Sequence, residues 1–317
     1  MRHFLGVDGG GSKTAAVIID EQGRTEGVGR APGSNHQVAG VEQAMRHVRM
    51  AVEGALADAG LSARDIHHAV YGLAGADRDV DLALLRPALA TLPIASWRVV
   101  CDTMIGLRLG SPSNTGVVLV CGSGTNAAGR NRHGVEVQVG GFGYLYGDFG
   151  GGTDLAREAF RMAIRSYEGR EIQSLLTEAV PHYLGYPDVE TMYNSYLDAG
   201  RTQVPRDLSI ILHQTADAGD TLACSVLSRL GSELGLAAHA VASRLPDVDD
   251  PFQLVLVGSV LQRGRHRLVI QSIENLLQER GWTYHLVIPE TPPVAGALGL
   301  ALDDVGISLP SESFQGL

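Results

Sequence analysis

The chain has 317 residues, of which 44% are hydrophobic and 19% charged, and it contains 40 glycines. This length exceeds one typical domain, so we expect two lobes that share a cleft, in an α/β protein with many tight turns. The formal net charge of −10 argues against a nucleic-acid or anionic-membrane surface, because both partners need a basic footprint.

The cysteines and the hydropathy pattern narrow the class further. Cys101, Cys121 and Cys224 form no CxxC pair and are odd in number, so neither a disulfide framework nor a structural zinc site is indicated. No segment approaches the 18 apolar residues of a membrane span, and no signal peptide opens the chain. We therefore expect a cytoplasmic protein.

The first predicted elements form an antiparallel meander. Residues 3–8 indicate a buried strand, and after a glycine turn residues 15–19 indicate a second strand. A turn at residues 20–24 leads into a third strand. A similar strand–turn–strand pattern recurs at residues 117–134, which predicts two related halves rather than a solenoid of short repeats.

Helical patterns follow each meander, over residues 41–59 and 153–164. The later elements are predicted as mostly helix over 157–245, strands at 252–260 and 284–290, and a helix from Val294 to about Leu302. We place one lobe at residues 1–112 plus about 292–317. The other lobe is placed at residues 113–291, with a helical insertion at about 157–220.

The stretch GVDGGGSKT, residues 6–14, matches neither common phosphate motif. In the P-loop pattern GxxxxGK[ST] the lysine directly follows the last glycine, whereas Ser12 separates Gly11 from Lys13 here. The dinucleotide fingerprint GxGxxG needs a helix to begin at its third glycine, but residues 15–19 continue as a strand. The stretch therefore predicts a strand–turn–strand hairpin.

Such a hairpin is able to hold a phosphate. Its glycine amides can approach an anion closely, and Asp8 at the strand end can organise a hydrated Mg²⁺. An ordinary glycine-rich turn is the alternative. The second copy, CGSGTN at residues 121–126, favours a phosphate clamp, because two such turns facing one cleft each supply amides and hydroxyls.

A carboxylate ends the apolar strand in RVVCDTMIGL, residues 98–107, where a helix is predicted to begin. An ionised Asp102 at that point can take a proton from a hydroxyl that attacks a phosphate. Aspartate is also a common helix N-cap. The local sequence leaves both interpretations open.

Six motifs, taken together and in this order, resemble one known family: GVDGGGSKT, CDTMIGL, CGSGTN, GGFGYLYGDFGGG, LVGSV and PPVAGALGLAL. The chain is similar to the BadF/BadG/BcrA/BcrD group of the actin-like ATPase superfamily from residue 6 to about residue 302. The resemblance implies a two-lobed, duplicated actin-like (ribonuclease H-like) α/β fold with a cleft between its lobes. It also implies ATP and Mg²⁺ as cofactors, and phosphorylation of an amino sugar, N-acetylglucosamine to N-acetylglucosamine 6-phosphate.

The same resemblance implies roles for individual residues. Asp102 is implied to be the base, and Lys13 to be either a phosphate ligand or a surface lysine. Asp8, from its place at the strand end, stays the expected metal-binding residue. The other residues implied to bind the nucleotide are Gly10, Gly11, Ser12, Thr14, Gly122, Gly124, Thr125, Gly258 and Ser259. The residues implied to bind the sugar are Asn35, His36, Gly141, Phe142 and Asp148.

Local alternatives accompany the sugar-binding residues. His36 is expected to be mainly structural, in a turn that needs no ligand to form. The glycine-aromatic segment alternatively forms a hairpin with Tyr144 and Tyr146 in the core and with Asp148 bonded to turn amides. A polyol partner would otherwise satisfy the acceptor oxygens of Asp148.

Some residues depart from the family pattern and leave the substrate open. Phe142 stands where animal kinases have tryptophan, Val139 where they have cysteine, and Ala74 where serine is usual. Glucosamine, N-acetylmuramic acid or a related anhydro sugar are therefore alternative acceptors. The partners we expect are an amino sugar, ATP and a second copy in a homodimer, with neither nucleic acid nor membrane.

Two other functions occur on related folds. One is an ATPase activator of a 2-hydroxyacyl-CoA dehydratase, which shares an iron–sulfur cluster across a dimer and needs exposed cysteines. Cys101 and Cys121 lie in predicted apolar strands and Cys224 in a predicted helix, so this alternative is disfavoured. The other is a sugar-responsive regulator, and the presence of Asp102 argues for chemistry instead.

Overall fold

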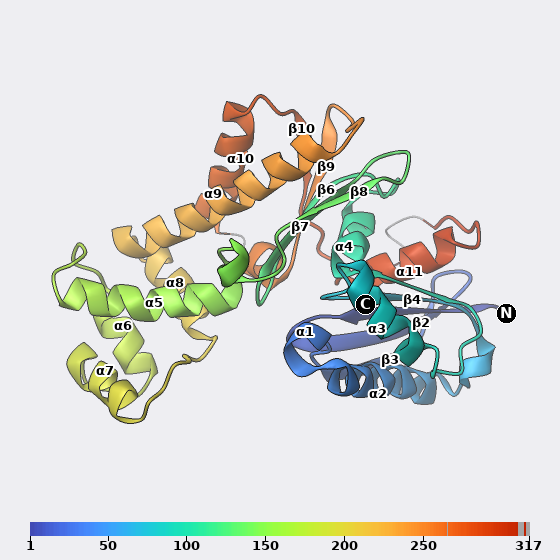
Figure 1. Cartoon of the computed structure of the whole chain (residues 1–317), viewed down its shortest axis with the longest axis horizontal. Helices are drawn as coiled ribbons and strands as arrows, with labels where there is room; N and C mark the ends of the chain where they lie inside the picture. Colours follow the sequence, from blue (N-terminus) through green and yellow to red (C-terminus); the bar gives the residue numbers. More distant parts are fainter. Residues whose placement is uncertain (265, 310–313, 315–317) are drawn as a thin grey trace.

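The computed structural model describes residues 1–264, 266–309 and 314. Its strands form two separate five-stranded sheets, and helices cover both of them (Figure 1). Residues 310–313 and 315–317, which the expected first lobe includes, lie outside the described residues. The division of the chain into lobes near residues 112 and 291 is retained as a proposal.

The first sheet has the order β3-β2-β1-β4-β5, so the central strand β1 pairs with β2 antiparallel and with β4 parallel. Its strands are β1 (His3–Gly9), β2 (Lys13–Asp20), β3 (Thr25–Pro32), β4 (Ile66–Leu73) and β5 (Trp97–Cys101). The predicted meander is present as β1 to β3. Because β1, β4 and β5 are parallel, their carboxyl ends lie at one edge of the sheet.

Alternation along the strands places separate apolar clusters on the two faces of the first sheet. Leu5 and Val7 point to one face and pack with helix α2 (Val41–Ala59), whereas Phe4 points to the other face and packs with helix α11 (Val294–Asp303). Helix α11 is buried along Val294–Leu302, which explains its lack of polar residues. The helices near this sheet are α1 (His36–Ala39), α2 (Val41–Ala59), α3 (Asp79–Leu89), α4 (Asp102–Gly110) and α11 (Val294–Asp303).

The second sheet has the order β10-β9-β6-β7-β8 and repeats the antiparallel meander and the parallel neighbour of the first. Its strands are β6 (Gly116–Cys121), β7 (Thr125–Arg130), β8 (Glu136–Val139), β9 (Phe252–Val257) and β10 (Tyr284–Val287). Its helices are α5 (Gly151–Tyr167), α6 (Leu176–Tyr183), α7 (Val189–Asp198), α8 (Leu208–Asp217), α9 (Thr221–Arg244) and α10 (Arg267–Glu279).

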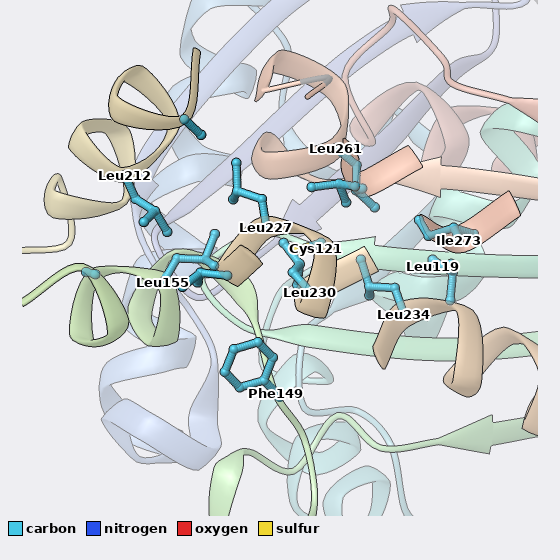
Figure 2. Packing of buried hydrophobic residues seen from close by; sticks show 14 of the residues in the cluster. Leu119, Cys121, Phe149, Leu155, Leu212, Leu227, Leu230, Leu234, Leu261 and Ile273 are labelled. Atoms are coloured by element: carbon cyan, nitrogen blue, oxygen red, sulfur yellow. The ribbon is translucent and has the colours of Figure 1, made fainter. Parts of the chain in front are cut away.

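One large apolar cluster joins the second sheet to its helices. Figure 2 shows Leu119 and Cys121 of β6 near Leu230 and Leu234 of α9, with Leu155 of α5 beyond them. The helices α5 to α8 extend away from the sheets and pack on one another (Figure 1). In the described part of the chain, no helix has the length and apolarity needed to cross a membrane.

Helix α4 connects the two halves. It follows β5 of the first sheet directly, yet Met104 and Leu107 pack on Val118 and Val257 of the second sheet. Gly106 allows α4 to lie this close to the second sheet, because a Cβ atom at that position would lie 2.9 Å from a methyl carbon of Val257. The first residue of α4, Asp102, is therefore held between the sheets.

Candidate active site

A cavity of ≈ 580 Å³ lies between the two sheets, and the turns that follow β1 and β6 both line it. The residues expected from the sequence that line the cavity are Asp8, Gly10, Gly11, Ser12, Lys13, Asn35, Asp102, Gly122, Gly124, Thr125, Gly141, Gly258 and Ser259. The two glycine turns therefore face one cleft.

The two turns approach each other closely. A Cβ atom on Gly11 would lie 2.7 Å from the Ser123 hydroxyl oxygen of the opposite turn. Each turn is closed by one backbone bond: Gly10 N–H donates to the Lys13 carbonyl over 3.0 Å, and Gly122 N–H donates to the Gly124 carbonyl over 2.9 Å. The two closing bonds span three and two residues respectively, so the turns differ in detail although both join the antiparallel strand pairs that the sequence repeat predicted.

The N-terminus of helix α5 supports the second turn from behind. Gly152 N–H donates to the Gly122 carbonyl over 2.8 Å, and Thr153 N–H donates to the Ser123 carbonyl over 3.1 Å. Gly151 has φ +74° and lies so close to Gly124 that a Cβ atom would be 2.5 Å from its Cα. Gly150 has φ +125° and a Cβ atom there would lie 2.4 Å from a methyl carbon of Leu230, so packing and backbone conformation require glycine at both positions.

A third turn, after β9, forms another wall of the cleft through Gly258 and Ser259. Gly258 has φ +96°, and a Cβ atom there would lie 2.4 Å from the Cys121 carbonyl oxygen. Any larger residue would push the turn away from β6. The cleft therefore has glycine-bounded walls from three strand ends.

Asp102 lies at the cleft surface, at the start of α4. Burial raises the pKa of its carboxyl to about 6, the Cys101 thiol bonded to it opposes the rise, and the Asp77 charge adds to it. The Cys101 thiol has one hydrogen, and its sulfur lies 3.3 Å from Asp102 Oδ1 and 3.0 Å from Asp77 Oδ1, so the two carboxylates share this donor. Above pH 7 the carboxylate is mostly ionised and able to accept a proton.

Asp8, at the end of β1, is a second carboxylate of the cleft. Burial and the Asp102 charge raise its pKa to about 7, and Lys13 opposes the rise. Among the described residues no group of three or more His, Cys, Asp or Glu side chains could hold a metal ion by itself. A site with one carboxylate suits Mg²⁺ only when phosphates and water complete its shell, and a cation there would relieve the repulsion between the carboxylates.

Several polar residues that line the cleft were not predicted from the sequence, and Asp77 and Asn126 are two of them. Asp77 Oδ1 accepts from the Cys101 thiol over 3.0 Å and from Asn126 Nδ2 over 3.4 Å, so the contact joins the two sheets' turns. Asp77 Oδ2 and Asn126 Oδ1 are buried and have no hydrogen-bond partner among the described residues. Asp77 follows β4, which pairs in parallel with β1 and with β5. A polar residue after this strand could therefore have been expected at the same edge of the sheet as Asp8 and Asp102, and this was the signal available in the sequence.

Two expected ligand residues point away from the cleft. Thr14 is buried, and its hydroxyl donates to the Pro32 carbonyl over 2.8 Å and lies 2.9 Å from the Ser34 hydroxyl oxygen. His36 is buried, with its Nε2 3.1 Å from an oxygen of Asp81. The structure therefore supports a structural role for both, and their ligand roles stay predictions.

The glycine-aromatic segment is largely exposed. Phe142 is 40% exposed, outside the residues that line the cleft, and its ring centroid lies 6.0 Å from the Arg78 guanidinium of the first lobe. Tyr144 and Tyr146 are exposed as well, so the alternative that buries them in the core is wrong. Asp148 accepts from the Gly143 amide within its own turn, as the local alternative expected. The sugar-binding roles of Phe142 and Asp148 stay predictions.

In comparisons with known proteins, both the sequence and the structure of this chain are similar to those of amino-sugar kinases. The chain is 28% identical over 265 residues to the N-acetylmuramic acid/N-acetylglucosamine kinase of Clostridium acetobutylicum, which covers 82% of this chain and 86% of that protein. It is 26% identical over 272 residues to a glucosamine kinase of Vibrio cholerae, covering 83% and 86%. A solved structure of a candidate N-acetylglucosamine kinase from Chromobacterium violaceum has a TM-score of 0.71 at 23% identity, covering 95% of this chain and 99% of that one.

The structural likeness and the sheet order together confirm the predicted two-sheet α/β fold of the actin-like ATPases. The family model of the BadF/BadG/BcrA/BcrD ATPases matches residues 5–302, which is nearly the whole chain. The chain therefore belongs to the BadF/BadG/BcrA/BcrD ATPase family.

Proposed function

We propose that this protein is an ATP-dependent sugar kinase that phosphorylates an amino sugar, converting N-acetylglucosamine to N-acetylglucosamine 6-phosphate. The observation that carries the proposal is the position of Asp102. Its carboxylate lies in a cleft lined by the glycine turns of both sheets. Phosphoryl transfer needs a base beside the acceptor hydroxyl and donors around the phosphates, and this cleft offers both.

The names of the relatives support the substrate class. One curated relative is a kinase of N-acetylmuramic acid and N-acetylglucosamine, and another is a glucosamine kinase. These sugars share a hexosamine ring and differ in the substituents on it. Glucosamine and N-acetylmuramic acid are therefore the alternative acceptors.

The nucleotide would bind along the three glycine-bounded turns. Backbone amides of the turns after β1 and β6 would face its phosphates, and Gly258 and Ser259 would face the adenosine. Lys13 and Arg263 also line the cleft and supply positive charge. Asp8 would hold Mg²⁺ together with the phosphates, and the cation would neutralise part of their charge.

The sugar would bind beside Asp102, between the two sheets. Asn35 and Gly141 line this cleft, as do Asp77 and Asn126. The unpartnered oxygens of Asp77 and Asn126 are acceptors, and an unsatisfied buried acceptor destabilises the protein until it meets a donor. A ligand rich in hydroxyl donors suits such a site after the lobes open to admit it.

The chemistry follows from these positions. The sugar hydroxyl oxygen attacks the γ-phosphorus of ATP, the bond between that phosphorus and the β–γ bridging oxygen breaks, and ADP leaves. Asp102 accepts the hydroxyl proton as the new P–O bond forms. Fixed donors from the turns stabilise the charge on the transferring group. Closure of the lobes would exclude water, which limits hydrolysis of ATP.

A panel of acceptors tests this proposal. ADP release would be measured with N-acetylglucosamine, glucosamine, N-acetylmuramic acid and glucose, and the product position would be assigned by NMR. We expect the highest kcat/KM with N-acetylglucosamine and phosphate on O6. Asp102→Asn, purified in parallel, controls for contaminating kinases. No activity with any hexosamine would refute the substrate class.

We also propose that the protein is a cytoplasmic homodimer. Cell fractionation would test the localisation, and sedimentation would test the oligomeric state.

A further inference from the structure

An arginine from the helical insertion touches the phosphate turn of the other lobe. Arg206 lies between helices α7 and α8, and its Nη1 donates to the Ser12 hydroxyl oxygen over 2.9 Å. Ser12 lines the cleft in the turn after β1. In Figure 1 the segment between α7 and α8 runs along the side of the insertion that faces the first sheet. A residue 194 positions away in the sequence thus reaches the proposed ATP site.

The Arg206 guanidinium is available to an anion. Its side chain is exposed, and it forms no ion pair within the residues that the structure describes. Arg157 and Arg161 of the same insertion differ, because each pairs with a carboxylate on α5. A guanidinium has five N–H donors, and the bond to Ser12 uses one of them. The remaining donors match the oxygens of a phosphate.

The position of Arg206 is set by the core behind it. Leu208, two residues later, is fully buried and begins helix α8. The adjacent carboxylate of Asp207 accepts from the Tyr183 hydroxyl over 3.3 Å. The backbone at Arg206 is therefore anchored on the insertion, while its long side chain extends to the other lobe.

Charge in the cleft favours an additional cation at this point. Asp8, Asp77 and Asp102 line the cleft, and the three phosphates of a nucleotide would add more negative charge. Lys13 and Arg263 are the cations that line it among the described residues. A guanidinium at the edge of the cleft can attract the phosphate oxygens strongly, because water screens charges near a protein surface less than it does in bulk solution.

We propose that Arg206 binds the terminal phosphate of ATP and thereby couples the helical insertion to phosphoryl transfer; this rests on the proposed kinase function. Ser12 lies in the turn between β1 and β2, and Asp102 directly follows β5 of the same sheet. Both residues line the cleft on the side of the first sheet, so the turn at Ser12 lies toward the acceptor side. The terminal phosphate must lie next to the acceptor hydroxyl, whereas the adenosine would lie by Gly258. A group at Ser12 therefore meets the γ-phosphate rather than the nucleoside.

The test compares Arg206→Gln and Arg206→Lys with Arg201→Gln, a matched control. Arg201 is exposed in the same segment and stacks on Tyr196 at 5.3 Å, away from the cleft. Binding of ADP and of AMPPNP, with Mg²⁺ and without sugar, would be measured by calorimetry. We expect Arg206→Gln to weaken AMPPNP by about tenfold or more, to leave ADP nearly unchanged, and to lower kcat by roughly 10- to 100-fold. Arg206→Lys should recover part of the loss, and Arg201→Gln should behave as the wild type.

Ser12→Ala separates phosphate binding from a mere contact between lobes. If Arg206 acts only through its bond to Ser12, Ser12→Ala and Arg206→Gln will lose the same amount of AMPPNP affinity, and the double variant will lose no more than either single variant. That result, or equal losses for ADP and AMPPNP, would overturn the proposal. The binding experiment needs no acceptor sugar. It therefore still measures the contribution of Arg206 to nucleotide binding if no sugar in the panel is phosphorylated. Absence of AMPPNP binding to the wild type would instead refute the use of ATP itself.

Discussion

Replacing Asp102 with asparagine should separate activity from stability. The amide keeps the shape of the side chain but cannot accept the proton of the attacking hydroxyl. We expect kcat to fall by roughly 10²- to 10⁴-fold, the usual contribution of a general base. This corresponds to about 3 to 5 kcal/mol of barrier. The KM for ATP should change little, because the phosphate turns remain intact.

The same substitution should stabilise the fold at neutral pH. The folded state raises the pKa of Asp102 to about 6, whereas an unperturbed aspartate has a pKa of about 3.9. Between these two values the folded chain binds more protons than the unfolded chain, so stability falls as the pH rises through this window. Above a pH of about 6 the ionised carboxylate lowers the free energy of unfolding by its full amount, about 3 kcal/mol for a pKa shift of this size. The uncharged amide escapes the penalty.

Thermal unfolding at pH 4 and at pH 8 measures this effect, alongside a pH profile of kcat. Asp102→Asn should melt higher than the wild type at pH 8 and nearly equally at pH 4, and wild-type kcat should decline as the pH falls through about 6. Asp79→Asn, an exposed aspartate in the first turn of α3, is the matched control and should do neither. Full turnover by Asp102→Asn, or a lower melting temperature at pH 8, would refute the reasoning.

Three further substitutions test other parts of the site. Asp8→Asn should raise the Mg²⁺ concentration for half-maximal activity about tenfold or more, since it removes the anionic oxygen proposed to hold the cation; an unchanged Mg²⁺ titration would exclude Asp8 as a ligand. Gly258→Ala should destabilise the fold by about 1 to 3 kcal/mol in denaturant unfolding and raise the KM for ATP, because its methyl group would lie 2.4 Å from the Cys121 carbonyl oxygen. His36→Ala should lower the melting temperature, since it leaves the buried Asp81 short of a partner, while the KM for the sugar stays within a few-fold; a large rise in that KM alone would instead support His36 as a ligand.

Much of the site was predictable because it depends on local sequence. Glycine runs that follow apolar strands specify turns, and the repeat of that pattern specifies two equivalent turns. The position of Asp102 between an apolar strand and a helix was predicted from the local sequence, and the structure places it at that junction. Its role as the base was implied only by the family resemblance and stays a prediction. Period-2 and period-3.6 patterns need only neighbouring residues, so β1 to β3 and α11 were predicted within a few residues.

The remaining features depend on which distant segments meet. Asp77 and Asn126 come together across the two sheets although they are 49 positions apart in the sequence, and Arg206 contacts Ser12 although they are 194 positions apart. His36 and Thr14 look like ligand residues in the sequence, but neighbouring elements supply their partners and turn them inward. The sequence alone determined the turns, the strands and the position of Asp102 between a strand and a helix. Only the tertiary structure decided which side chains share the cleft, because packing between elements far apart in the chain sets the direction of each side chain.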